Sequence, residues 1–301
     1  MKLISISLAS GCVESYVDLL LEPRLPTFIG LSRDVKAARA VLVGVPHDSS
    51  STCKPGCRFA PRRVREVSQN LETYDPRLGV DASELPAADV GDLREALSPA
   101  KVVEDVAKVV RELSRAGKTP FVIGGDHMVT LGALKGLTEG FSLIMFDAHL
   151  DYRDEFPEGE KLSHATVLRR AREGPVKEAI VVGARAISKE EIVALERDKQ
   201  IRVVYPWSMS RVKDELSTLS GRIYVTVDMD VFDPSVAPGV GCPEPGGLTF
   251  SELAELLTEV MDSRVVGFDV VEANPLVDVN DITSCAVAKL LMKALILLLA
   301  R

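Results

Sequence analysis

Short apolar runs alternate with longer amphipathic stretches along this chain. The apolar runs are almost continuously hydrophobic, which is typical of strands that helices cover on both sheet faces. The runs that predict strands are Ala40–Val45, Thr119–Ile123, Phe141–Phe146, Glu178–Val182, Gly221–Val227 and Arg264–Val271. The stretches that predict helices are Val102–Ala116, Ser251–Asp262 and Ser284–Ala300. Together they predict an α/β fold of three layers (α-β-α), in which a mainly parallel central sheet lies between two layers of helices.

The chain has 301 residues, of which 46% are hydrophobic, and this is enough to bury a large core. No internal repeat, low-complexity tract or linker interrupts the pattern, so we expect a single domain over residues 1–301. The net charge of −8 argues against nucleic acid as a partner and is compatible with a cationic substrate. No apolar run reaches the length of a membrane span, so we expect no membrane partner.

The five cysteines are an odd number and show no paired zinc spacing. Cys53 and Cys57 have no second pair elsewhere, so we interpret them as reduced structural thiols. The segment Met1–Cys12 loosely resembles a lipoprotein signal, but its apolar stretch is only about seven residues long. Glu14 and Asp18 follow at once, and we therefore expect a cytoplasmic protein.

Acidic residues and histidines follow four of the predicted strands. Gly124–His127 (GGDH) follows one strand and Asp147–Asp151 (DAHLD) follows the next. Asp228–Asp230 (DMD) and Glu272 follow two further strands. Because ligands of parallel sheets bind beyond the carboxyl ends of the strands, these side chains should gather at one edge of the sheet.

The aspartates of these motifs predict a metal site. Asp147, Asp151, Asp228 and Asp230 would repel one another strongly in an empty site, and metal ions neutralise such a cluster best. If the backbone stays extended, Asp147, His149 and Asp151 point to the same side, as do Asp228 and Asp230. Ligation by many oxygens and one or two imidazoles suits Mn²⁺ better than a thiolate-binding metal. Taken alone, Asp228 and Asp230 could equally cap a loop ahead of a proline.

The chain has only four histidines, and three of them lie in or just after these motifs. A lone histidine is usually a packing or surface residue. Beside the aspartates, however, His127 and His149 are typical of metal ligands. His47 lies outside the acidic motifs, and we interpret it as a residue near the rim of the site at most.

Several ordered motifs resemble the signatures of the ureohydrolase family, which contains arginases and agmatinases. The matching segments are GGDH at 124–127, FDAHLD at 146–151, SHAT at 163–166, VDMDVFDP at 227–234 and FDVVEANP at 268–275, with GVP at 44–46 and GCRFAP at 56–61. The resemblance extends over roughly residues 40–300. Several motifs in the right order are far more specific than one short pattern. The resemblance implies an arginase-like fold and a hydrolase that acts on linear amidines.

The resemblance also implies a pair of manganese ions held by two histidines and four aspartates. The implied ligands are His127 and Asp151 for the first ion, His149 and Asp230 for the second, and Asp147 and Asp228 as bridges. In the family, a hydroxide that bridges the two metals attacks the guanidinium carbon. No other cofactor is implied.

Three catalytic residues follow from the same resemblance. Glu272 would pair with the guanidinium group of the substrate, because such pairing is geometrically specific. His164 would carry a proton to the leaving amine. Asp151 would act both as a ligand and in catalysis, and Asp126 would orient a metal ligand.

The segment between the metal motif and the proton-shuttle histidine bears on the substrate. Arginases read the substrate carboxylate with a polar Ser-Gly-Asn segment there, which Tyr152–Ser163 lacks. The segment instead carries four acidic residues, Asp154, Glu155, Glu158 and Glu160. These would favour a second positive charge, as in agmatine, although Arg153 and Lys161 could instead meet a carboxylate. The segment at 237–248 also resembles agmatinases, with Cys242 where many relatives have threonine.

We therefore expect hydrolysis of agmatine to urea and putrescine, a reaction of polyamine biosynthesis. Aminopropylagmatine, arginine and guanidinobutyrate remain alternative substrates. Two other classes fit less well: a non-catalytic metal-binding relative would have lost a ligand, and a zinc deacetylase on a similar architecture would need one metal and fewer aspartates. Members of the family form trimers or hexamers, so we expect a homo-oligomer.

Overall fold

The computed structural model describes residues 15–24, 26–94, 98–137 and 140–300, so the segment Met1–Cys12 lies outside the described residues. The described part contains a nine-stranded sheet with the order β1-β5-β2-β6-β11-β10-β7-β8-β9. Its strands are β1 (Leu21–Glu22), β2 (Ala40–Gly44), β5 (Ala87–Leu93), β6 (Thr119–Ile123), β7 (Phe141–Phe146), β8 (Val176–Val182), β9 (Ile201–Val204), β10 (Ile223–Asp228) and β11 (Val265–Val271). Every neighbouring pair is parallel except β1–β5. A separate hairpin is formed by β3 (Tyr74–Asp75) and β4 (Val80–Asp81).

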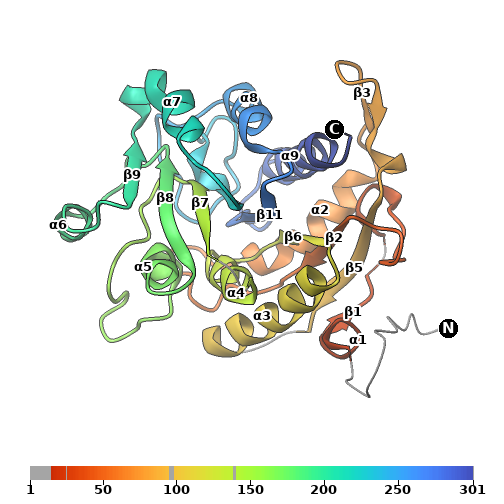
Figure 1. Ribbon diagram of the computed structural model, residues 1–301, viewed down its shortest axis with the longest axis horizontal. Coiled ribbons are helices and arrows are strands. Elements are labelled where there is room, and N and C mark those ends of the chain that lie inside the picture. Colours follow the sequence, from red (N-terminus) through yellow and green to blue (C-terminus); the bar gives the residue numbers. More distant parts are fainter. Residues whose placement is uncertain (1–14, 25, 95–97, 138–139, 301) are drawn as a thin grey trace.

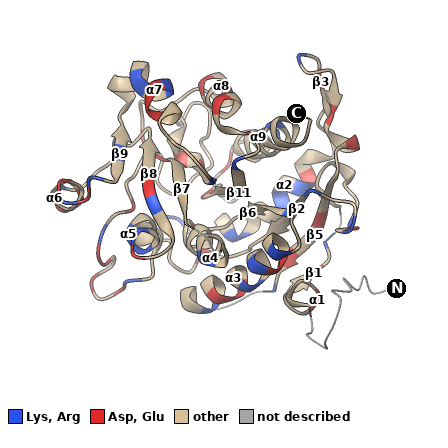
Figure 2. Ribbon diagram, viewed as in Figure 1, with Lys and Arg blue, Asp and Glu red and all other residues tan. Residues whose placement is uncertain are grey.

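Helices cover both faces of this sheet (Figure 1). Their bounds are α1 (Tyr16–Leu20), α2 (Ala60–Ser68), α3 (Pro99–Arg115), α4 (Met128–Gly136), α5 (Val167–Arg172), α6 (Lys189–Leu195), α7 (Val212–Ser217), α8 (Phe250–Val260) and α9 (Ile282–Leu299). Charged residues lie mainly on the helices and loops, while most strands carry few (Figure 2). The predicted three-layer α/β fold is confirmed.

The alternation of side chains along each strand builds two separate cores. On β2, Leu42 belongs to the core that contains α2, α8 and α9, whereas Val41 and Val43 belong to the core that contains α3, α4 and α5. The same division holds on β7, where Ile144 and Met145 point into opposite cores. Because both faces are buried, the strands can be apolar throughout, as the sequence indicates.

The strand β5 was absent from the sequence prediction because two aspartates interrupt its apolar pattern. Asp89 and Asp92 are buried in this strand, and the equally buried Arg65 of α2 forms ion pairs with both. A buried charge is tolerated only when it is paired and hydrogen-bonded. The partner of these acids lies more than twenty residues away, so the local pattern could not reveal it.

Helix α9 corrects one expectation from the sequence. Its 18 residues have a mean hydropathy of 2.0, so by length and composition this described helix could span a membrane. However, 72% of the residues in that window are buried inside the molecule, and a core helix of this kind passes the same test. Its apolar residues pack against the sheet in the same core as α2 and α8.

Candidate metal centre and pocket

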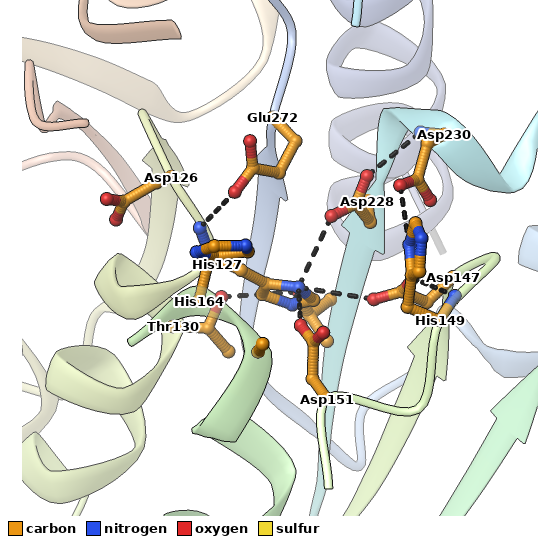
Figure 3. A network of polar contacts seen from close by, with 12 residues as sticks. Asp126, His127, Thr130, Asp147, His149, Asp151, His164, Asp228, Asp230 and Glu272 are labelled. Atoms are coloured by element: carbon orange, nitrogen blue, oxygen red, sulfur yellow. Dashed lines mark hydrogen bonds and ion pairs between the residues drawn. The ribbon is translucent and has the colours of Figure 1, made fainter. Parts of the chain in front are cut away.

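The four predicted motifs follow four neighbouring strands at the middle of the sheet. The order β6-β11-β10-β7 places the GGDH segment, Glu272, the DMD segment and the DAHLD segment side by side. Figure 3 shows their side chains converging at the carboxyl ends of these strands. The predicted gathering of acids and histidines at one sheet edge is therefore observed.

His127 lies at the centre of the first group of acids. Its Nδ1 is 3.2 Å from Oδ2 of Asp147, 3.0 Å from Oδ2 of Asp151 and 3.3 Å from Oδ2 of Asp228. Nevertheless, Nδ1 of His127 and Oδ2 of Asp147 are buried and satisfy no hydrogen-bond geometry among the described residues. Polar atoms that crowd together without aligned hydrogen bonds are the arrangement expected of ligands that share a cation.

His149 forms a second group with Asp147 and Asp230. Its Nδ1 is 2.9 Å from Oδ2 of Asp230 and 3.6 Å from Oδ1 of Asp147. Asp147 thus presents one oxygen to each histidine. His127, Asp147 and Asp228 form one set with the spacing of metal ligands, and Asp147, His149 and Asp230 form the other. The described residues therefore fit two metal ions that share Asp147, while Asp228 lies in the first set alone.

The backbone that delivers these ligands is not extended, contrary to the sequence expectation. Strand β7 ends at Phe146, and Asp151 has a positive φ of 48°, which non-glycine residues seldom adopt. Met229–Val231 form a 3₁₀ turn, in which the amide of Asp230 donates to Oδ1 of Asp228 at 2.9 Å. The side chains converge because these turns redirect the chain. Such strained conformations are found mainly where function requires them.

The charges of the group are strongly coupled. Burial raises the pKa of Asp228 well above its ordinary value, and the nearby charges of Asp230 and Asp147 raise it further. Burial lowers the pKa of His127, but contacts with Asp147, Asp151 and Asp228 outweigh this effect and raise it well above the ordinary value. A metal ion bound among these side chains would supply the positive charge that favours the ionised carboxylates.

A second layer of polar residues supports His127 and was not predicted from the sequence. Nε2 of His127 lies 3.2 Å from Oγ1 of Thr226, which is itself 3.3 Å from Oγ1 of Thr130. The buried Asp269 interacts with both threonines and accepts a hydrogen bond from Tyr224 at 2.7 Å. These contacts fix the ring so that Nδ1 faces the acids. The register of β10 against β11 and the position of α4 bring these residues together.

Arg185 supports the second group in a similar way. Its guanidinium donates to the carbonyl oxygens of Asp230 at 2.8 Å, Phe232 at 3.2 Å and Glu244 at 2.7 Å. The amide of Ala148 donates to Oδ1 of Asp230 at 3.0 Å. These bonds hold the turn that carries Asp230 against the segment that carries His149.

Glu272 is partly buried beside the metal ligands and lines the pocket. It has a positive φ of 64°, and its Oε1 accepts a hydrogen bond from the amide of His127 at 2.9 Å. Burial raises the pKa of Glu272 well above its ordinary value, and the charge of Asp126 raises it further. A cation bound beside this carboxylate would favour its ionised form.

His164 also lines the pocket and is held by the loop after β2. Its Nδ1 lies 2.7 Å from the carbonyl oxygen of Ser50, and its amide donates to Oγ of Ser50 at 3.0 Å. Because a carbonyl only accepts, Nδ1 is the donor and Nε2 is free to face the pocket. Nε2 lies 3.4 Å from Oγ1 of Thr52.

Asp126 takes a different place from the one expected. Its Oδ2 accepts hydrogen bonds from the amide of Ser50 at 3.0 Å and from Oγ of Ser50 at 2.7 Å. Asp126 therefore supports Ser50, which holds His164, and these bonds do not reach the side chain of a metal ligand. Gly125 is needed nearby, since an added Cβ would lie 1.7 Å from the carbonyl oxygen of His47. His47 itself is buried behind Asp126 and is not among the residues that line the pocket.

The pocket reaches from the metal ligands to the surface past Arg153 and Phe156. The four carboxylates of the predicted acidic segment do not line it, which corrects the expected tail pocket. Asp154 instead pairs with Arg170 at 2.6 Å. Phe156 places its ring 4.9 Å from the guanidinium of Arg153 and meets the ring of His164 edge-on. Glu191 is another acidic residue that lines the pocket. It already accepts hydrogen bonds from Ser188 and from the amide of Tyr152.

Comparison with known proteins supports the class that this site defines. The sequence profile described as Arginase family matches residues 38–297, and the chain belongs to this family. Members of the family are hydrolases of guanidino compounds that use a binuclear metal centre, and the chain is a hydrolase of this ureohydrolase type.

The names of individual relatives also specify a substrate. The chain is 39% identical to N(1)-aminopropylagmatine ureohydrolase of Thermococcus kodakarensis over 84% of this chain and 88% of that protein. It is 34% identical to agmatinase of Bacillus subtilis over 89% of this chain and 95% of that one. The crystal structure of agmatine ureohydrolase of Thermoplasma volcanium superposes with a TM-score of 0.84 at 33% identity, covering 91% and 94% of the two chains.

Proposed function

We propose that this protein hydrolyses agmatine to urea and putrescine with two Mn²⁺ ions bound. The observation that carries the proposal is the position of a partly buried carboxylate, Glu272, in the same pocket as two ligand groups that share Asp147. A guanidinium group beside Glu272 would thereby lie next to the metals. The names of the relatives support agmatine or its aminopropyl derivative as the guanidino compound.

Each residue of the site has a separate task in this proposal. His127, Asp147, Asp151, Asp228, His149 and Asp230 hold the metals. When bound, two divalent metals make water a strong nucleophile at neutral pH. Glu272 binds and orients the guanidinium group.

The reaction balances with one water molecule. The water oxygen forms a bond to the guanidinium carbon, and the bond from that carbon to the alkyl-bearing nitrogen breaks. Both protons of the water end on the leaving nitrogen, which departs as the amine, and the remaining fragment is urea. Because the carbonyl oxygen of Ser50 binds Nδ1–H of His164, Nε2 carries a lone pair that accepts one of these protons and passes it to the leaving nitrogen.

Aminopropylagmatine is a second candidate substrate because the relative from Thermococcus kodakarensis carries that name at 39% identity. Both compounds present a guanidinium at one end and an amine further along. Among the described residues, Arg153 and Lys54 are positively charged side chains that line the pocket. Neither lies in a Ser-Gly-Asn segment of the kind with which arginases bind the substrate carboxylate.

A comparison of urea release tests this proposal. Agmatine, aminopropylagmatine, arginine and guanidinobutyrate are assayed with the Mn²⁺-loaded protein under one condition. We expect kcat/KM for one of the two amine-tailed substrates to exceed that for arginine by at least about tenfold, because polar contacts to a substrate tail discriminate sharply. Equal or better efficiency with arginine would show that Arg153 receives a carboxylate, and would exclude the agmatinase assignment. Glu272→Gln serves as the inactive control.

We further propose that residues 1–301 act as one cytoplasmic domain and that the chain assembles into a homo-oligomer, either a trimer or a hexamer. Light scattering after size-exclusion chromatography distinguishes these states. A monomer at working concentration would contradict the proposed assembly without affecting the proposed reaction.

A further inference from the structure

Two cysteines line the substrate pocket and have no part in the proposed reaction. Cys53 is exposed on the loop after β2, and Cys242 is partly buried on the loop after β10. The two loops come from distant parts of the sequence. The described cysteines are all reduced.

The backbone holds these two loops against each other. The amide of Asn274 donates to the carbonyl oxygen of Gly239 at 2.7 Å, and its side-chain Nδ2 donates to the carbonyl oxygen of Lys54 at 2.9 Å. A Cβ added to Gly241 would lie 3.5 Å from that same oxygen of Lys54, so the two segments lie close together there. Cys53 precedes Lys54 in the sequence, and Cys242 follows Gly241. The approach of Lys54 to Gly241 therefore brings the two cysteine side chains to the same wall of the pocket.

The thiols are also close enough to influence each other. Burial raises the pKa of Cys242 to about 12, and the nearby Cys53 thiol adds to this rise. The other described cysteines are placed differently. Cys57 is buried against Ser51 and the backbone of His47, and Cys285 lies at the start of α9.

We propose that Cys53 and Cys242 form a reversible disulfide across the wall of the pocket, and that this bond slows turnover. The oxidant is a low-molecular-weight disulfide. The exposed Cys53 sulfur attacks it, forms a mixed disulfide and releases one thiol. The Cys242 sulfur then attacks Cys53, forms the internal bond and releases the second thiol. Both cysteines lose one proton and one electron each, and the small disulfide is reduced to two thiols.

The bond acts on the reaction through the loop that carries Cys53. Ser50 and Thr52 lie on the same loop and contact the two ring nitrogens of His164. A disulfide would tie this loop to the segment of Cys242 and shift the position of His164 or narrow the path of the substrate. Small displacements of a catalytic group are costly, so we expect urea release to fall by about tenfold or more.

The test uses the full-length, Mn²⁺-loaded protein and glutathione disulfide as the probe. After treatment, peptide mapping without reduction should find a cross-linked pair that contains Cys53 and Cys242. Urea release should fall together with the appearance of this peptide and return after dithiothreitol. Only the activity measurement rests on the proposed function, because the cross-link is read by mass and does not depend on the substrate.

Three variants make the result specific, each compared with its own reduced activity. Cys53→Ser should resist inhibition, Cys242→Ser should stop at a glutathione adduct on Cys53 without an internal cross-link, and Cys285→Ser, outside the pocket, should respond as the parent does. A cross-link between Cys53 and Cys57, or no cross-link after full reaction with the probe, would overturn the proposal. So would formation of the Cys53–Cys242 bond without loss of activity, or inhibition of Cys53→Ser equal to that of the parent.

Discussion

At the scale of single residues, Asp147 connects the two halves of the metal centre. Its Oδ2 faces Nδ1 of His127, and its Oδ1 faces Nδ1 of His149 and accepts the amide of that residue at 2.6 Å. Burial raises the pKa of this carboxyl, but contacts with the two histidines outweigh that effect and bring the pKa to about 2. It therefore remains an anion at any pH at which the enzyme would work, and both metals can use it.

Substitution of Asp147 or Asp228 by alanine should unbalance the centre as a whole. We expect each variant to lose nearly all urea release, because the ligands act as a unit and a missing carboxylate leaves uncompensated charge. Elemental analysis should find less than the parent's metal content. Asp154→Ala is a matched control, since this exposed acid pairs with Arg170 outside the pocket. Full metal content with normal activity in Asp228→Ala would refute the ligand assignment.

Ser50 is predicted to be a positioning residue for His164. Its Oγ links the amide of His164 to the carboxylate of Asp126, while its carbonyl oxygen fixes Nδ1. Ser50→Ala removes only the first link, so we expect kcat to fall by about tenfold while KM changes little. Ser50→Thr, which keeps the hydroxyl, should restore most of the rate. A fall in kcat that threonine does not restore, or a change confined to KM, would indicate a different role.

At the scale of elements, the pocket loop after β2 depends on one buried carboxylate. Asp48 accepts hydrogen bonds from the amide of Gly56 at 2.7 Å and from Nε of Arg58 at 2.6 Å, which closes the loop. Burial raises the pKa of Asp48, but the bonds from Arg58 and Gly56 outweigh it and hold the pKa below its ordinary value of 3.8.

The sign of this shift gives a pH-dependent prediction. Because the folded pKa is depressed, Asp48 stabilises the fold above pH 3.8 and loses this effect as the pH falls toward its folded value. Asp48→Asn should therefore lower the free energy of unfolding by about 2 kcal/mol at pH 7. At lower pH the difference from the parent should shrink. Denaturant unfolding at several pH values measures both quantities, and a difference that grows on acidification would contradict the assignment.

At the scale of the whole molecule, metal binding should couple to protons and to stability. His127 and Asp228 have raised pKa values without metal, so loading must displace protons from the centre. We expect Mn²⁺ to release protons into a weakly buffered solution and to raise the Tm by several degrees, which a chelator reverses. At fixed Mn²⁺, urea release should rise from pH 6 to pH 9. A flat profile, or loading without proton release, would speak against this coupling.

Much of the fold and of the site could be predicted from the sequence because their signals are local. The continuous apolar runs predicted β6 and β7 with their observed bounds, and the acids and histidines after four strands predicted one site. Parallel strands end at a common edge, so residue type and strand direction are sufficient for this inference. The family resemblance added the pairing of ligands, which residue spacing alone does not determine.

The tertiary structure decided what depends on contacts between distant segments. Only strand order makes β6, β11, β10 and β7 neighbours, and only their register places Thr226 behind His127. The acidic segment after Asp151 was expected to line the pocket, but Asp154 turns to Arg170 of α5 because that helix offers a partner. Backbone strain at Asp151 and Glu272 likewise has no sequence signal, since it exists only where surrounding packing enforces it. The sequence therefore determined which chemical groups meet, and the fold determined how they face one another.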